Sequence, residues 1–273
     1  MKRFAAVLVL ALMASAAEAG PWPIGQRHFY AKLSYQHLHS TTLATPDGTK
    51  FDIPAFTKDD VGLYVAYGVS ERFTVLLNAP VLRSSNLRDE PDELARESGI
   101  GDLQFGLQAQ LGRKGPWVFA LRGMLQAPTG DETRAQGLLP TGSGVWEGQG
   151  WIGAGRSLAG GRGYGYVEVG YEGRGGGLRD GFVYALQLGW NASSRMVLAA
   201  NVRGVEPFSR TAGSRTAGSF VGVGDRVTYA AYGPTAIVKL GGGVAVQLDW
   251  DGALHTRNLA EGGVFRVGVS LSR

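Results

Sequence analysis

Apolar and polar residues alternate one by one along much of this chain, and this pattern restricts the possible folds more than any other feature. The clearest stretch is Leu103-Gln104-Phe105-Gly106-Leu107-Gln108-Ala109-Gln110-Leu111. Successive side chains of a β-strand point to opposite faces, so a strand here has one apolar face and one face of glutamine and glycine. A helix would scatter the glutamines around its circumference. The pattern therefore predicts a strand.

The same alternation recurs from Phe29 to Leu271, and the composition agrees with it. The chain has 43 glycines without a collagen-like period, mixed with many strand-forming residues, which indicates an all-β protein. Glycine and alanine leave the facing of two segments open, those at 147–158 and 227–240. The strand-like segments are 28–39, 61–67, 73–79, 102–111, 117–128, 147–158, 167–172, 184–191, 198–203, 227–240, 244–251 and 265–271.

The connections between these segments alternate between long and short. The short ones are 69–72, 112–115, 159–163, 191–195 and 240–243, and the longer ones are 40–60, 84–99, 129–146, 173–181, 204–225 and 252–262. Outer-membrane barrels have short periplasmic turns and longer outer loops. We therefore predict a transmembrane antiparallel up-and-down β-barrel of about twelve strands, with both termini in the periplasm. A soluble periplasmic sandwich is the alternative fold, but it has no reason to collect its long loops at one end.

The first residues have the order of an export signal. Lys2 and Arg3 precede an apolar run from Phe4 to Ala14, and Ala17-Glu18-Ala19 forms a small-x-small cleavage site. We predict a cleaved signal peptide at 1–19 and the barrel at 20–273. The apolar run is shorter than the ~20 residues that a membrane helix needs, and no second one follows. Because backbone groups in hydrocarbon must pair within the protein, a spanning chain without helices has to close into a barrel. This places it in the outer membrane of a Gram-negative bacterium, with outer-membrane lipids and the barrel-assembly machinery as partners.

Several kinds of chemistry are excluded or disfavoured by residue content. The chain has no cysteine, which rules out disulfides and thiolate metal sites, and its net charge of +4 is too small for a nucleic-acid surface. His37 and His39 lie two apart on one strand face, a geometry that could hold a metal ion, but no carboxylate motif accompanies them. We predict no catalytic site, no metal site and no cofactor. The near-repeat of 128–131 (PTGD) and 140–143 (PTGS) lacks the lysine and helix of a phosphate loop and predicts turns at a barrel rim.

Charged residues lie on the face opposite the apolar one. An arginine or lysine that faces lipid at mid-membrane costs about 2–4 kcal/mol, so these residues must face the lumen. They either neutralise one another and plug a narrow barrel, or form a polar constriction that selects solutes. Four tyrosines on the same face offer flat apolar surface to an aromatic solute. The predicted selectivity residues are Lys32, Asp102, Gln104, Gln108, Arg122, Glu168, Arg203, Asp249 and Arg266, and the tyrosines are Tyr30, Tyr64, Tyr164 and Tyr166.

Three segments resemble a known family. They are 70–80 (SERFTVLLNAP), 98–107 (SGIGDLQFGL) and 125–131 (LQAPTGD). The G-x-G-D-x strand start and the Pro-Thr-Gly-Asp turn are similar to those of the outer-membrane proteins grouped as the "MetA-pathway of phenol degradation" family. The resemblance implies a barrel that transports hydrophobic or aromatic compounds.

We therefore predict a passive outer-membrane channel for small hydrophobic or aromatic solutes, and not an enzyme. One alternative is a structural or surface-interaction barrel whose lumen is plugged. The other is an outer-membrane lipid-modifying enzyme, which would need a clustered serine or histidine near the outer rim.

Overall fold

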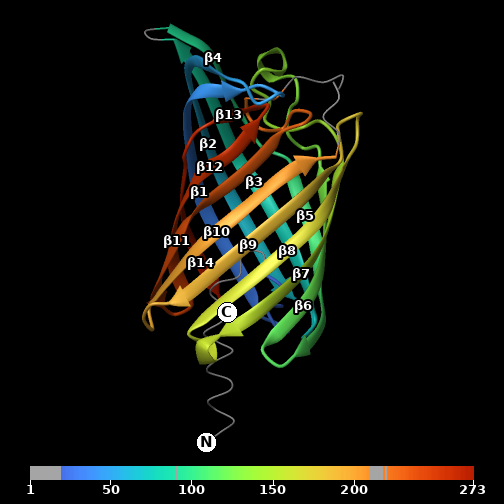
Figure 1. Cartoon of the computed structure of the whole chain (residues 1–273), viewed down its shortest axis with the longest axis vertical. Coiled ribbons are helices and arrows are strands. Elements are labelled where there is room, and N and C mark those ends of the chain that lie inside the picture. Colours follow the sequence, from blue (N-terminus) through green and yellow to red (C-terminus); the bar gives the residue numbers. More distant parts are fainter. Residues whose placement is uncertain (1–19, 90–91, 209–217, 219) are drawn as a thin grey trace, which may run out of the picture.

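The chain forms a single closed barrel of antiparallel strands (Figure 1). The computed structural model describes residues 20–89, 92–208, 218 and 220–273, so the predicted signal peptide lies outside the described residues. Two short 3-10 turns, η2 (Arg134–Gly137) and η3 (Ala159–Gly161), interrupt the connections. The strands are β1 (Phe29–Ala44), β2 (Lys50–Gly68), β3 (Phe73–Asp89), β4 (Asp92–Gly99), β5 (Leu103–Lys114), β6 (Trp117–Ala127), β7 (Glu147–Leu158), β8 (Gly163–Arg174), β9 (Gly181–Asn191), β10 (Met196–Pro207), β11 (Thr228–Gly241), β12 (Val244–Arg257), β13 (Leu259–Glu261) and β14 (Val264–Ser272).

The sheet closes because β1 pairs with β2 on one side and with β14 on the other. Of the fourteen strands, β4 and β13 are not separate positions around the barrel. β4 pairs with the upper part of β3, while β5 pairs with the lower part of the same strand. β13 likewise pairs with β1 above β14. Twelve positions therefore surround the lumen, which confirms the predicted barrel.

The two ends of the barrel differ, as Figure 1 shows. The short hairpins and the C-terminus lie at one end, which we call the turn end. The long connections project from the other, which we call the loop end. Neighbouring strands are antiparallel throughout, so the predicted segregation of short and long connections is confirmed.

The prediction that 40–60 and 84–99 are loops is wrong, because most of each segment forms paired strands. β1 and β2 remain paired as far as Ala44 and Lys50, and β3 and β4 as far as Asp89 and Asp92. Above the lipid both faces of such a hairpin meet polar surroundings, so the alternation disappears while the backbone hydrogen bonds persist. The segment 252–262 is also mostly strand, for the same reason.

The outward face is apolar and carries aromatic residues near both ends of the strands. Tyr67, Phe73, Trp117 and Trp190 are exposed at the turn end, and Phe182, Trp250 and Phe265 are exposed towards the loop end. On β9, Phe182 and Trp190 are separated by about 26 Å of strand, or roughly 20 Å of height at the usual tilt. This is close to the ~25 Å apolar band between the aromatic girdles of outer-membrane barrels. In the described part of the chain, no helix is long and apolar enough to cross a membrane.

The structure also fixes the facing of the two segments that the alternation left open. In β7, Ile152 faces outward while Trp151 faces the lumen, where the guanidinium of Arg122 lies 4.9 Å from its ring centre. In β11, Ile237 is buried in the lumen and Val238 is exposed.

The apolar band predicts a depth-dependent cost of charge. Leu107 and Leu111 lie on the outward face of β5, 46% and 53% exposed, with Leu111 nearer the turn end. Leu107→Arg should lower the free energy of unfolding by about 2–4 kcal/mol, and Leu111→Arg by about 0–1 kcal/mol. Urea unfolding in lipid vesicles measures both. Equal costs at the two depths would contradict a membrane band centred near Leu107.

Candidate functional site: a polar chamber in the lumen

A cavity of about 500 Å³ lies inside the barrel. This volume falls within the ~300–1,000 Å³ typical of small-molecule sites. Its wall is assembled from strands that are far apart in sequence, and most of the side chains that line it are polar or charged. The polar and tyrosine residues that line it are Ser34, Gln36, Lys58, Asp60, Tyr64, Asn78, Arg83, Tyr166, Gln187, Asn201, Arg203, Thr235, Gln247, Asp249, Asp251 and Arg266.

One part of the chamber wall, on β2 and β3, combines two cations with one carboxylate. Arg83 Nε donates to Asp60 Oδ1 at 2.8 Å, and Lys58 Nζ lies 3.5 Å from Asp60 Oδ2. The cross-strand register of Asp60 with Arg83 explains the first contact. We call these three residues the basic corner.

A second charged part of the wall lies on β10, β12 and β14. Arg266 is directly opposite Asp249 in the register, at 3.8 Å, and is 3.6 Å from Asp251. Asp251 also accepts a hydrogen bond from Arg203. Gln36 on β1 accepts two more bonds from Arg266, at 2.8 and 3.2 Å. This part holds two cations and two carboxylates and is balanced in charge.

A belt of hydrogen bonds joins five consecutive strands, from Tyr164 in the turn-end half to side chains of the chamber wall. Tyr164 donates to Gln187 at 2.7 Å, and Gln187 donates to Asn201 at 2.5 Å. Asn201 donates to Thr235 at 2.9 Å, and the Thr235 hydroxyl donates to Asp249. Each side chain is thus held in one orientation by its neighbours.

The turn end of the lumen is occupied by residues 20–24 of the segment 20–27, whose exposed Gln26 and Arg27 lead to β1. Gln108 Nε2 donates to the carbonyl oxygens of Gly20 and Trp22, at 3.0 and 3.2 Å. The Trp22 ring packs edge-on against Tyr164 and Tyr166, with centroids 5.9 and 6.2 Å apart. A Cβ at Gly155 would lie 2.6 Å from Trp22, so glycine at that position makes room for the segment.

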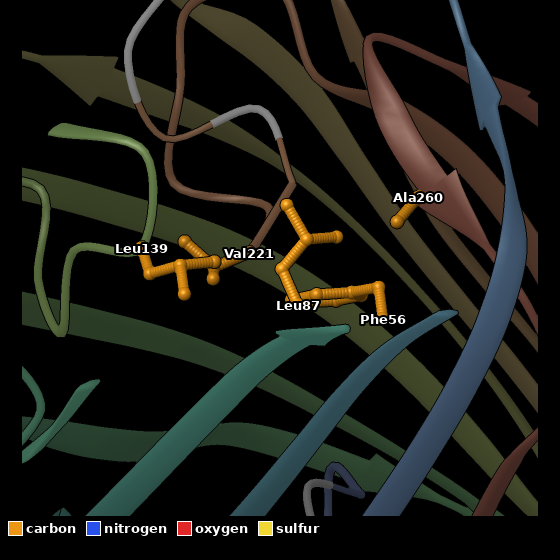
Figure 2. Packing of buried hydrophobic residues seen from close by; sticks show 5 residues of the cluster. All are labelled: Phe56, Leu87, Leu139, Val221 and Ala260. Atoms are coloured by element: carbon orange, nitrogen blue, oxygen red, sulfur yellow. The ribbon is translucent and has the colours of Figure 1, made fainter. Parts of the chain in front are cut away.

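The loop end of the lumen is covered by inward-folded connections. Phe56 and Leu87, on β2 and β3, pack with Leu139 and Val221 from two different connections, and with Ala260 of β13 (Figure 2). Phe56, Leu139 and Ala260 have almost no exposed surface. These connections therefore pack on an apolar cluster inside the mouth of the barrel.

Asp102 and the two Pro-Thr-Gly turns hold the connection 128–146 in place. Asp102 Oδ1 accepts from the Gly130 N–H at 2.9 Å, and Oδ2 accepts from the Ser143 N–H at 2.6 Å. Gly130 and Gly142 pack so closely that a Cβ on either would lie within 3 Å of the other's Cα atom. The predicted rim turns are confirmed, and they stack on each other around Asp102. In the same connection, hydrogen bonds from Thr133 lower the pKa of Asp131.

Side chains from the barrel wall also tie down these connections. Arg83 donates to the carbonyl of Thr141 at 2.9 Å, and Lys58 donates to that of Val221 at 3.0 Å. Arg174 is paired with Glu147 at 3.0 Å and donates to the carbonyl oxygens of Val223 and Gly224. The basic corner therefore contacts both the chamber and its cover.

All of the predicted lumen residues point inward, but they lie at different heights. Midway along β6 and β8, Arg122 is paired with Glu168 at 3.2 Å. Tyr30 packs against Tyr64 with ring centroids 6.0 Å apart. Their effect on solute selection stays a prediction. The chamber contains Tyr64, Tyr166, Arg203, Asp249 and Arg266, the turn-end half contains Lys32, Gln108, Tyr30 and Tyr164, Arg122 and Glu168 lie midway along their strands, and Asp102 and Gln104 lie at the loop-end rim.

The sequence analysis missed the basic corner and the segment at Trp22. Lys58 and Asp60 fell in a predicted loop, and Arg83 fell just past a predicted strand. One feature of the sequence could have indicated the basic corner. Lys58 and Asp60 are two residues apart and lie on the same face of β2 as the inward Tyr64. The residues 20–24 have no alternation that would place them inside a barrel.

The histidines do not gather with other metal-binding groups. His37 Nδ1 lies 2.8 Å from Asp59 Oδ1, which also accepts from the Tyr35 hydroxyl at 2.5 Å, on the outer surface. Among the described residues there is no group of three or more histidines and carboxylates suited to a metal ion.

Comparison with known proteins places the fold among outer-membrane channels. No protein-family model matches the chain, and no curated protein matches it in sequence. In structure it is similar to the COG4313 outer membrane channel from Pseudomonas putida F1, with a TM-score of 0.70, 17% identity, and coverage of 94% of this chain and 99% of that one. It is also similar to the NanC porin (TM-score 0.55, 7% identity, 89% and 98% covered) and to the KdgM porin (0.52, 7%, 88% and 98%). The likeness predicted from the sequence is thus confirmed at the level of fold.

Asp102 offers a test of how the cover is held. Asp102→Ala removes the acceptor for the Gly130 and Ser143 N–H groups, and should cost about 3 kcal/mol of stability because hydrogen bonds to charged groups are worth roughly 1.5–3 kcal/mol each. Trypsin should then cleave faster after Arg134, which is 45% exposed in the same connection. Glu93→Ala, which removes an exposed carboxylate on β4 away from that connection, is the control and should leave the rate nearly unchanged. Equal rates in the two variants would refute the anchoring role.

Proposed function

We propose that this protein is a passive outer-membrane channel for small solutes with aromatic or other apolar groups. The loop end faces the outside, and both ends of the mature chain lie in the periplasm. The observation that carries the proposal is the polar chamber within a closed barrel whose outer face is apolar. The similarity to outer-membrane channels and porins supports it through the fold.

The chamber favours solutes with both polar and apolar parts. Tyr64, Tyr166 and Ile237 present apolar surface, and the side chains around them present amide, hydroxyl and charged groups. A hydrocarbon alone would displace water from these polar groups and offer no hydrogen bond in return, which is costly. A ring that carries polar substituents can meet both kinds of surface.

The residues 20–24 narrow the turn end, so permeation depends on their displacement. Residues 20–24 are tied to the barrel by two hydrogen bonds from Gln108 and one from the Ile24 N–H to the Thr74 hydroxyl at 3.3 Å, while the Gln26 and Arg27 N–H groups bond to Glu71 and to the Gly68 carbonyl. The apolar contacts of the segment come from Trp22, which packs on Tyr164 and Tyr166, and from Ile24, which packs on the cluster of Tyr30, Ala66 and Leu76. A segment held in this way can move aside at a modest cost.

The same segment favours a second candidate function, a structural or surface-interaction barrel with a plugged lumen. In that case the segment stays in place and the projecting hairpins β1–β2 and β3–β4 do the binding. Single-channel conductance in planar bilayers separates the two functions, because a plugged barrel carries no current.

Removal of the segment tests its role in conduction. A mature chain that lacks residues 20–24 should conduct several-fold better than the full mature chain, because the Trp22 ring leaves the lumen. Trp22→Ala should have an intermediate effect. Trp117→Ala, a change of the same size on the outer surface, is the control and should leave conductance unchanged. A full chain that conducts as well as the deletion variant would contradict this account.

Solute preference is tested with a matched pair of neutral glycosides. The measured quantity is the ratio of the uptake rate of phenyl glucoside to that of methyl glucoside in proteoliposomes. This ratio should be higher for the wild type than for Tyr64→Ala or Tyr166→Ala. Tyr64→Phe keeps the ring and should preserve the ratio. If the alanine variants keep the wild-type ratio, the tyrosines do not contact the solute.

A further inference from the structure

The basic corner indicates which solute charge the chamber prefers, and this inference rests on the proposed channel function. We propose that Lys58 and Arg83 form a recognition site for a single carboxylate, so that the chamber favours organic monoanions over neutral molecules of the same shape.

The charges of the chamber support an anion site at this corner. Its lining holds four basic residues, Lys58, Arg83, Arg203 and Arg266, and three acidic ones, Asp60, Asp249 and Asp251. On β10, β12 and β14 the two arginines are matched by two aspartates. The excess positive charge is therefore located at the corner, where two cations share Asp60.

The geometry of the corner leaves donors for a ligand. A guanidinium has five N–H donors and an ammonium has three. Arg83 uses Nε for Asp60 and Nη1 for the Thr141 carbonyl, and Lys58 uses Nζ for Asp60 and the Val221 carbonyl. Backbone carbonyls orient a cation but carry no net charge, so they do not cancel it. Both cations are fixed in position before a solute arrives, which reduces the entropic cost of binding.

The environment of the corner strengthens its attraction for a carboxylate. The side chains of Lys58 and Arg83 are each 13% exposed, so water screens them less than it screens surface charges. Arginine binds carboxylates through two parallel bonds, which adds geometric specificity.

The position of the corner places it on the path of a solute. Thr141 and Val221 belong to the connections that cover the loop end, so the corner lies where the chamber meets its cover. In the ring of twelve positions, β2 and β3 stand opposite β9 and β10, whose Gln187 and Asn201 also line the chamber. A solute that enters the chamber from the loop end passes between these two sides.

The experiment compares benzoate with benzamide, which has nearly the same shape and no charge. Calorimetry with the purified full mature chain should show benzoate binding more tightly than benzamide. Arg83→Gln and Lys58→Gln should each weaken benzoate binding by about tenfold, the value of one charge-assisted bond, and leave benzamide unchanged. Arg83→Lys keeps the charge but loses the paired donors, and should fall between the wild type and Arg83→Gln.

Lys50→Gln is the matched control, because Lys50 carries the same charge on the outer hairpin, paired with Glu261 at 2.7 Å. It should bind benzoate as the wild type does. Heat-modifiable gel mobility shows that each variant is folded. Equal affinity for benzoate and benzamide in the wild type, or wild-type benzoate affinity in both glutamine variants, overturns the proposal.

Ion selectivity gives an independent readout of the same site. In a KCl gradient the reversal potential should show a preference for chloride, which Arg83→Gln reduces and Asp60→Asn increases. Benzoate binding without any conductance would refute the channel and leave the anion site standing. Conductance with no anion preference and no benzoate discrimination would refute the anion site and leave the channel standing.

Discussion

Closure of the sheet between β1 and β14 is the interaction on which the rest of this structure depends. It leaves no strand edge within the band of outward leucines and valines, so backbone groups are paired where no water could pair them. Closure also creates the interior. Residues as distant in sequence as Gln36 and Arg266 become cross-strand neighbours only because the last strand returns to the first.

Apolar clusters lie towards both ends of the interior, and between them the chamber wall is held by charged and amide side chains. In most soluble domains such groups would be desolvated at a high cost, but here they solvate one another across neighbouring strands. The same residues link the chamber to its cover, since Lys58 and Arg83 line the cavity and also hold the carbonyls of Val221 and Thr141.

Period-two alternation was sufficient to predict the twelve strands of the barrel, the facing of all but two of them, and the inward charges. It succeeded where one face of a strand meets lipid, as in Leu103 to Leu111. It was insufficient above the membrane, where Lys58 and Asp60 belong to a strand that has polar residues on both faces. It also gave no indication that residues 20–24 enter the lumen, because Trp22 packs on Tyr164 and Tyr166 through contacts that no local pattern encodes.

A closed β-barrel with an apolar exterior follows from the sequence alone, because successive side chains of each strand face lipid and lumen in turn. The pairing of the inward charges follows only from the three-dimensional arrangement of the strands. The register puts Arg266 against Asp249, and the strand order brings Arg122 across β7 to Glu168. The unequal sharing of Asp60 between Lys58 and Arg83 likewise depends on the register of β2 with β3. Charge balance around a lumen depends on distances between strands, and a linear pattern does not contain those distances.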